Sequence, residues 1–463
     1  SLSLKAKGSD EILLAFNTDI KSFHFDHPET REIFLPVHAE GSGHLIKSDL
    51  NNLKLSYRLG TLASGMATGA LKDFGKGSIK FDQNLTMNLA EVAGKLPKKF
   101  TALLTKDVIG TAQAKTSITG QLDAKFIPTQ LRGTADFELA GLTAGLKEPA
   151  LNIKNLNTRI SFPLEFYSDK GVRIQNLDIH AELQGAEAPK TWKVNSLNLD
   201  TKIATQAFHN LRADFGTLPV QVDTRVALGN VSNHQPALSL TDLKIDFNMK
   251  ADLLSDDVRN TRVKGKLSFK NLAALEILKS GDWVSRFNLD VHGKSLTRIR
   301  LSQKTQINKP SINQNGLELG LKSVSLESKS RQNLKEGEMN IDSFLFQSPD
   351  LVNARLKATL KDWGQSFDME GAITNLQMGS IWNQLSAPDM ENIKVDGDME
   401  ITLKAKGQLP AFDDKNRVAP PLWSQLLVPA NVNERASLEM QAGIQLRDGF
   451  VEDSAQKILG ENL

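Results

Sequence analysis

The stretch IKVDGDMEITLKAKG, residues 393–407, alternates apolar or small residues with polar residues along its whole length. Its odd positions carry Ile393, Val395, Gly397, Met399, Ile401, Leu403, Ala405 and Gly407. Each even position carries a charged residue or a threonine. Successive side chains of a β-strand point to opposite faces, so this alternation predicts a long strand with one apolar and one hydrated face.

The same alternation recurs far from this stretch. The opening heptad LSLKAKG, residues 2–8, differs from ITLKAKG, residues 401–407, only by Leu for Ile and Ser for Thr. One kind of strand is therefore repeated from end to end. The residues predicted to form its apolar surface are Leu2, Leu4, Leu243, Ile245, Phe247, Met249, Ile393, Val395, Met399, Ile401 and Leu403.

A second pattern, apolar-x-[Asn/Asp/Ser]-apolar, interrupts the alternation. A spacing of three would send the next apolar residues to the hydrated face unless a bulge or tight turn corrects the phase. Asn, Asp and Ser suit such positions because their short side chains bond to nearby backbone. We therefore predict bulges or turns at Asn155, Asn176, Asn271 and Asn375. The copies are LNNL (50–53), IKNL (153–156), IQNL (174–177), VNSL (194–197), LTDL (240–243), FKNL (269–272), LKSV (321–324) and ITNL (373–376).

These patterns predict an all-β protein: a long, curled, antiparallel-rich sheet of degenerate repeats, groove-like, with a few short helices. Strands of about 10 residues and connections of about 6 leave room for roughly 25 strands. We expect a repetitive amphipathic sheet over 1–407, a Pro-rich linker with a short helix over 408–430, and terminal strands and a helix over 431–463. Helices are expected at 97–110, 271–281, 378–388, 420–429 and 454–463.

Composition excludes several functional classes. Lys and Arg number 56 against 54 Asp and Glu, with no long basic block, so we expect no nucleic-acid partner. The chain has no cysteine, which rules out disulfides and cysteine-ligated metals. No apolar run approaches the roughly 20 residues of a membrane-spanning helix. Because the chain opens within the alternating pattern, we interpret it as a fragment or a processed chain.

Motifs that carry chemistry are scarce, so we expect neither enzymatic activity nor a cofactor. The Gly-rich segment 60–78 fails the phosphate-loop pattern, because Gly75-Lys76 is followed by Gly77 and preceded five residues earlier by Ala70. The segment 23–44 holds four of the eight histidines. Imidazole and carboxylate can bind zinc, which makes His24, Asp26 and His38 weak metal candidates. The flanking prolines favour an exposed loop instead, so our prediction is no metal site.

A sheet that is apolar on one face must cover that face. The degenerate amphipathic strands, the tetrapeptides above and phrases such as IQLRDGFV (444–451) resemble the AsmA-like, TamB-type family of bacterial envelope proteins. The resemblance implies a periplasmic protein, anchored in the inner membrane by an N-terminal helix outside this chain. It also implies a β-groove that holds phospholipid or other acyl lipids and aids their transport or envelope assembly between the two membranes, with other envelope proteins as partners. The alternative is a non-catalytic scaffold or ring component whose apolar face is closed by a second sheet.

Overall fold

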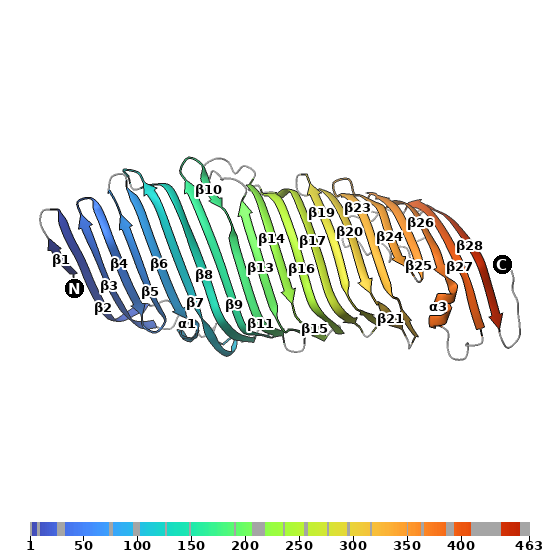
Figure 1. The fold of residues 1–463 in the computed structure, drawn as a ribbon, viewed down its shortest axis with the longest axis horizontal. Coiled ribbons are helices and arrows are strands. Elements are labelled where there is room, and N and C mark those ends of the chain that lie inside the picture. The colour runs from blue at the N-terminus through green and yellow to red at the C-terminus, as the bar shows by residue number, and fades with distance from the viewer. Residues whose placement is uncertain are drawn as a thin grey trace. The chain divides into compact units, whose positions relative to one another are not determined.

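The computed structural model shows an all-β protein, whose described residues form 28 strands and two short helices (Figure 1). The strand pairs among these residues are antiparallel, which confirms the predicted fold class. The structure describes residues 2–6, 10–25, 33–73, 77–95, 102–125, 127–147, 150–188, 191–205, 218–234, 237–253, 258–275, 277–293, 297–314, 317–349, 351–362, 365–385, 393–408 and 437–453.

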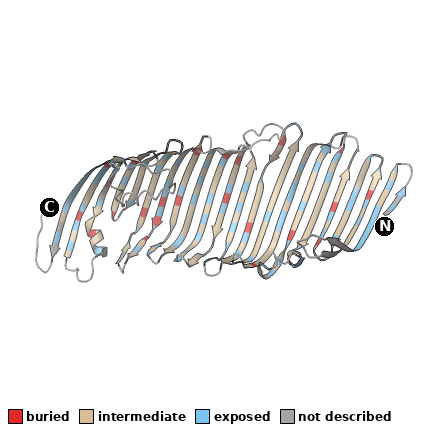
Figure 2. Cartoon of the chain, turned by 180° about the vertical axis from the view of Figure 1, so that it is seen from behind, coloured by how far each residue is buried: buried red, intermediate tan, exposed pale blue. Residues whose placement is uncertain are grey.

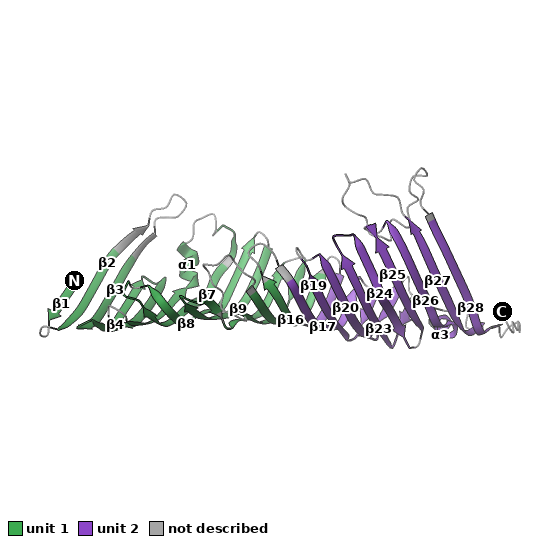
Figure 3. Ribbon diagram, turned by 90° about the horizontal axis from the view of Figure 1, so that it is seen from above, with its two compact units in different colours: residues 1–235, 246–256 green, residues 236–245, 257–463 purple. Residues whose placement is uncertain are grey.

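Contacts divide the chain into two compact units (Figure 3). Unit 1 comprises residues 1–235 and 246–256, and unit 2 comprises 236–245 and 257–463. The division falls within strand β16 (Ala237–Leu253). Of the predicted linker 408–430, only Gln408 is among the described residues, so the linker and its helix stay a prediction.

Unit 1 is a meander in which most strands pair with the strands next to them in the chain. Where a short strand intervenes, the long strands pair past it: β9 with β11, and β11 with β13. The strands are β1 (Leu2–Ala6), β2 (Glu11–Phe25), β3 (Ile33–Ile46), β4 (Asp49–Leu59), β5 (Ala63–Leu71), β6 (Ser78–Asn88), β7 (Leu104–Leu122), β8 (Pro128–Lys147), β9 (Ala150–Tyr167), β10 (Gly171–Ile174), β11 (Leu177–Ala188), β12 (Trp192–Val194), β13 (Leu197–Thr205), β14 (Leu218–Leu228) and β15 (Val231–His234).

Unit 2 follows the same plan. Its long strands pair in the order β17, β19, β20, β23, β24, β25, β26, β27 and β28. The strands are β17 (Val258–Ala274), β18 (Leu278–Ser280), β19 (Trp283–His292), β20 (Arg298–Asn308), β21 (Ser311–Gln314), β22 (Leu317–Gly320), β23 (Ser323–Asn333), β24 (Glu338–Ser348), β25 (Val352–Lys361), β26 (Ser366–Gln377), β27 (Ile393–Gln408) and β28 (Ser437–Asp453).

The tetrapeptides lie where the prediction places them. Five copies sit inside strands, and their third residue has a left-handed backbone with φ between 48° and 53°: Asn52, Asn155, Asp242, Asn271 and Asn375. The other three copies fall at the breaks between β10 and β11, β12 and β13, and β22 and β23. Asn176 lies in the first of these breaks. The prediction of bulges or turns at the four asparagines is confirmed.

In each tetrapeptide the two apolar residues are three positions apart instead of two, and we call this interruption of the alternation a step. In unit 1 the steps of neighbouring strands lie opposite one another across the ladder. Leu183 of β11 pairs with Leu197 of β13, and Ala186 of β11 pairs with Val194 of β12. The break between β12 and β13 also lies beside the break between β14 and β15. Here Asn195 N–H donates to the Asn230 carbonyl, and Gly229 N–H donates to the Ser196 carbonyl. The steps therefore form a row across these strands rather than separate irregularities.

Unit 2 contains a comparable row. The amide of Asn271 donates to the Gly281 carbonyl, and the amide of Gly281 donates to that of Asn308. The next residue, Lys309, donates to the carbonyl of Lys322. Because bulges bend a strand and strengthen its twist, aligned steps let neighbouring strands bend together while the backbone stays hydrogen-bonded.

The two helices occupy places where a strand stops. Helix α1 (Leu89–Lys95) follows β6 and packs against β7. Helix α3 (Met378–Leu385) follows β26 and packs against both β22 and β27. Its Trp382 donates an indole N–H hydrogen bond of 2.7 Å to the Ile393 carbonyl. Each helix thus packs against a strand other than the one that it follows.

The helix expected at 378–388 is confirmed over Met378–Leu385, whereas two others are wrong. Residues 104–110 begin β7, because pairing with β8 outweighs the helical spacing of its apolar residues. Residues 271–281 finish β17 and form β18, which pair with each other. The expected helices at 420–429 and 454–463 lie outside the described residues.

Both units are single layers of strands. Contacts between strands follow the ladders, and in the parts of the chain that the structure describes no second sheet is stacked on either face. Figure 2 shows that buried residues are scattered and that intermediate and exposed residues dominate. The accessible surface is 30166 Å², against about 17,000 Å² for a compact monomer of this mass. Few of the described residues are buried, and most are half-buried or exposed.

Candidate functional site

The candidate site is the apolar face of the sheet. In unit 2 this is the face that carries Leu403, and in unit 1 it is the face that carries Phe137. Directly opposed residues of an antiparallel ladder lie on the same face, so the register defines this surface. In unit 2 one row of opposed residues crosses seven strands. It runs through Thr305, Leu326, Phe346, Ala354, Ile373, Ile401 and Ile444.

Unit 1 has an apolar face of the same kind. A row of opposed residues crosses β6, β7, β8, β9 and β11 without a charged residue. It runs through Leu85, Ala114, Phe137, Ile160 and Ile179. Phe137 is an exposed member of this row. In each unit, apolar side chains thus continue from strand to strand as well as along each strand.

The predicted residues of β27 lie on this face. Ile393, Val395, Met399 and Ile401 are half-buried, and Leu403 is 39% exposed. Leu403 is the more open because its opposed neighbours, Gly371 on β26 and Ala442 on β28, are small.

The predicted residues of β16 and β1 can also be placed. In β16 the side chains of Leu243, Ile245, Phe247 and Met249 are half-buried, and exposed Lys244 and Asp246 alternate with the first three. Leu2 and Leu4 are opposed to Phe16 and Leu14 across the β1–β2 ladder.

Polar residues interrupt the apolar face of unit 2 in a cluster that the sequence prediction missed. Thr305 is fully buried, and its hydroxyl donates a 2.9 Å hydrogen bond to Ser285. The amide of Gln303 donates to both hydroxyl groups, at 3.0 Å to Thr305 and 3.2 Å to Ser285. The signal was present in the sequence, since Gln303 and Thr305 occupy alternating positions between Leu301 and Ile307.

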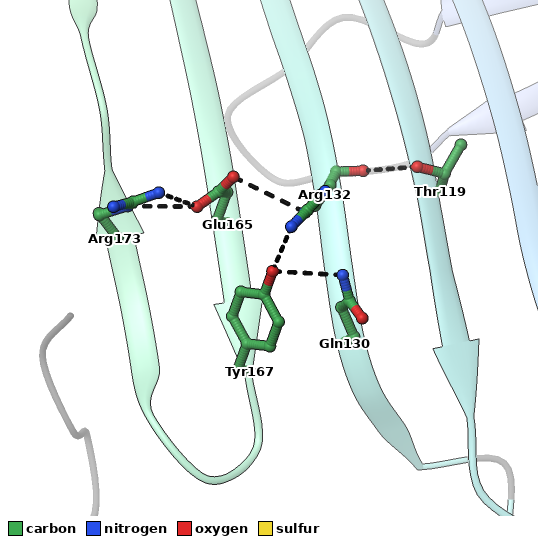
Figure 4. Close-up of polar contacts among 6 residues, drawn as sticks. All are labelled: Thr119, Gln130, Arg132, Glu165, Tyr167 and Arg173. Carbon is green, nitrogen blue, oxygen red and sulfur yellow. Dashed lines mark hydrogen bonds and ion pairs between the residues drawn. The ribbon is translucent and has the colours of Figure 1, made fainter.

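The opposite, polar face carries ion pairs between neighbouring strands, and Figure 4 shows one cluster of them. The guanidinium of Arg173 donates to Glu165 at 2.5 Å, and Arg132 lies 3.7 Å from the other carboxylate oxygen. Arg132 also donates to the Tyr167 hydroxyl at 2.5 Å. The hydrogen bond from Arg173 holds the pKa of the Glu165 carboxyl below its ordinary value. These groups satisfy one another, which fits a role in holding strands together.

The polar face also carries shallow hollows. One of about 240 Å³ lies over β5 to β8 and is open to solvent. Most of the residues that line it are of polar type, among them Asp82, Lys115 and Asp136. Two of its lining residues are bonded to each other, since Ser117 donates a 2.6 Å hydrogen bond to Asp82. A hollow as shallow and open as this one encloses little of a small molecule.

The weak metal candidates are not brought together. His38 is bonded to Asp19 at 2.6 Å, and Glu40 lies 4.0 Å from its other ring nitrogen. The backbone of His24 is opposed to Phe34, about 13 Å along β3 from His38. Asp26 and the side chain of His24 lie outside the described residues. Among the residues that are described, no three His, Asp or Glu side chains are grouped to hold a metal ion.

Comparison with known proteins gives no family model, no curated protein and no solved structure that matches this chain. Within the described residues, no helix has the length and apolar character needed to cross a membrane.

Proposed function

We propose that this protein holds the acyl chains of lipids on its apolar face and aids their movement or their use in envelope assembly. The observation that carries the proposal is the single-layer sheet whose apolar face is uncovered by any second sheet in the described residues of either unit. A surface of this kind must be covered by something apolar, because a monomeric protein rarely leaves extended apolar patches in water.

Acyl chains fit this surface physically. Each methylene transferred from water to an apolar contact contributes about 0.8 kcal/mol. The lateral rows through Ile373 and Ile401, and through Ile160 and Ile179, repeat apolar contacts at the spacing of neighbouring strands, about 4.8 Å. An acyl chain bound to one strand therefore finds similar apolar contacts on the next strand. This favours movement along the sheet, because no single position binds the acyl chain much more tightly than its neighbours.

The cellular setting is part of the same proposal. The likeness to AsmA-like, TamB-type proteins favours a place in the bacterial periplasm, with tethering to the inner membrane through an anchor outside this chain. The expected partners are phospholipids or other acyl lipids and other envelope proteins. The charged face, with pairs such as Arg173–Glu165, would stay in contact with water while the apolar face holds lipid.

Site-specific photo-crosslinking in cells tests the proposal. A photoreactive residue at Ile401 or Leu403 should capture phospholipid, since both lie on the apolar face. The matched control is Lys404, which is exposed on the opposite face and paired with Glu370 at 3.5 Å. Mass spectrometry of lipids extracted with the purified protein should identify the bound species.

A charge on the apolar face gives a second readout. Leu403→Asp should block lipid capture while leaving the melting temperature close to that of the control Thr402→Asp, because water reaches the carboxylate on an open face. Loss of stability in Leu403→Asp, together with no lipid adduct at 401 or 403, would overturn the proposal. That result would favour the scaffold alternative, in which protein covers this face.

A further inference from the structure

The polar face of unit 2 carries an excess of basic side chains. Four rows of opposed residues on this face cross β19, β20 and β23, and three of them continue to β17. They hold nine basic residues and two acids, Asp290 and Glu327. The basic residues are Arg262, Lys264, Lys266, Arg286, Arg298, Arg300, Lys304, Lys329 and Arg331.

This excess is not a general property of the polar face. Four rows on the polar face of unit 1 cross β6, β7, β8 and β9. They hold the same number of basic and acidic residues: Lys80, Lys115, Arg132 and Arg159 against Asp82, Asp136, Glu138 and Glu165. The basic excess is therefore a local feature of β17 to β23.

Three of the nine basic residues are bonded to acids, and the other six have no carboxylate partner in the part of unit 2 that the structure describes. The three pairs are Arg262–Asp290, Lys304–Glu327 and Arg331–Asp342, the last acid coming from β24. The other six, which we call the cationic patch, are all exposed: Lys264, Lys266, Arg286, Arg298, Arg300 and Lys329.

Some residues of the cationic patch face other cations. Arg286 lies between Lys266 and Lys304 in one row, and Arg300 is opposed to Arg331 in another. Like charges that are directly opposed destabilise a sheet. The arrangement therefore costs stability in the free protein, and an anion placed over these residues would offset the repulsion.

The cationic patch also borders a hollow. Arg300 and Lys329 line an open depression of about 460 Å³, together with Ser302. The two acids that line it are engaged in the pairs named above. Since Arg300 and Lys329 have no acid partner among the described residues, their N–H groups can donate to an anionic group that enters the hollow, such as a phosphate.

We propose that the cationic patch binds the anionic head groups of a membrane surface. The patch crosses four strands, about 14 Å at the usual spacing, so a lone phosphate would reach only part of it. A membrane that contains anionic lipid presents many phosphates in a plane, and each Lys or Arg near such a surface strengthens binding. The rows contain no Phe, Tyr or Trp on which the bases of single-stranded nucleic acid would stack. The inference concerns the face opposite to the apolar one and does not rest on acyl-chain binding.

Co-sedimentation with lipid vesicles tests the proposal. Vesicles of equal parts phosphatidylcholine and phosphatidylglycerol should bind the protein at least about tenfold more tightly than vesicles of phosphatidylcholine alone. Binding should weaken when salt is raised from about 0.1 M to about 1 M, because the range of electrostatic attraction falls from about 10 Å to about 3 Å. Leu403→Asp, which changes the apolar face, should keep this binding, so failure here and failure of acyl-chain binding can be told apart.

Charge reversal within the cationic patch gives the second readout. Arg286→Glu/Lys329→Glu should weaken binding to the anionic vesicles at least about tenfold. The matched control is Lys54→Glu/Lys154→Glu, which changes the net charge of the chain by the same amount. Both control residues are exposed in unit 1 and opposed to uncharged residues. The control should bind within about twofold of the natural chain, because charges beyond the screening length contribute little.

Arg286→Glu alone should not lower the melting temperature, because the new carboxylate faces Lys266 and Lys304. A lower melting temperature would contradict the repulsion on which the proposal rests. Equal binding to the two kinds of vesicle, or equal losses in the charge-reversal variant and its control, would overturn the proposal. So would release of the protein from the vesicles by inorganic phosphate at constant ionic strength, which would indicate a site for a lone phosphate. Tighter binding to single-stranded DNA than to the anionic vesicles would overturn it as well.

Discussion

The rings of Phe269 and Trp283 stack with centroids 5.3 Å apart, at directly opposed positions of β17 and β19. Phe269 begins the tetrapeptide 269–272, and Trp283 is the first residue after the break between β18 and β19. The stack therefore lies beside the row of steps in unit 2. Aromatic stacking here supports the strands at the point where their regular ladder is interrupted.

The first prediction concerns this stack. Phe269→Leu and Trp283→Leu should each destabilise unit 2, and a double-mutant cycle should give a coupling of about 0.5–1.5 kcal/mol. Denaturant unfolding monitored by circular dichroism measures it. Phe269→Leu combined with Phe346→Leu on β24 is the control pair. Its effects should add within about 0.5 kcal/mol because the residues share no ladder. A coupling as small as that of the control pair would contradict the stack.

The second prediction concerns the left-handed residues. Asn375 has φ of 53°, a conformation that costs an alanine about 1–2 kcal/mol. Asn375→Ala should therefore lower the free energy of unfolding by about that amount, and Asn375→Gly should recover most of it. The control is Asn176, which holds the same position of its tetrapeptide without a left-handed backbone. Equal losses in Asn375→Ala and Asn176→Ala would show that backbone strain is not the cause.

The third prediction is a pH dependence from His180. A hydrogen bond of 2.7 Å to Asp200 raises the pKa of this imidazole above its ordinary value. A raised pKa in the folded state means that the contribution to stability is full below the ordinary histidine pKa and is lost as the pH rises through the raised value. The effect is small, because the His180 side chain is 45% exposed.

Nuclear magnetic resonance titration of His180 checks the shift, and melting temperature against pH checks its consequence. Asp200→Asn should return the pKa of His180 toward its ordinary value. It should also make the melting temperature depend less on pH between the ordinary pKa and the raised one. An unchanged His180 titration in Asp200→Asn would refute the assigned cause.

The fourth prediction concerns Glu165, which is 16% exposed and accepts hydrogen bonds from Arg173. Glu165→Gln should destabilise unit 1 by about 1 kcal/mol at neutral pH, since one charge-assisted pair is lost while Arg173 is partly exposed. The pKa of Glu165 is lowered in the folded state, so this contribution is present above the ordinary carboxyl pKa and disappears as the pH falls through the lowered value. The two proteins should therefore converge in stability in acid, and a constant difference across pH would contradict the ion pair.

The strands and their faces could be predicted from the sequence because a period of two is a local property. The steps at Asn155, Asn271 and Asn375 were predictable for the same reason, since three-residue spacing shows within four letters. Their alignment into rows was not, because it depends on the number of residues in each hairpin and on which strands pair. The break at 194–197 lies opposite residues 183–186 of β11 only because the intervening turn sets this register.

The wrong helices share one cause. Residues such as Leu104 and Val108 have a helical spacing, yet β8 offers this segment a long antiparallel partner. The polar cluster of Gln303, Thr305 and Ser285 was missed because its members come from two strands and meet only through the register. The exposure of Leu403 likewise depends on Gly371 and Ala442, residues contributed by its two neighbouring strands.

The meander has a consequence for cooperativity. Among the described residues, strand β25 is paired with β24 on one side and β26 on the other, so the free energy within each unit is close to a sum over adjacent pairs. Unfolding of such a unit proceeds by fraying, with hydrogen exchange fastest in the outermost strands and slowest in the middle ones. The same locality lets whole hairpins be gained or lost without redesign of distant strands. Copies of the tetrapeptide that begin at 269, 321 and 373, spaced by the same number of residues, are what such duplication would leave.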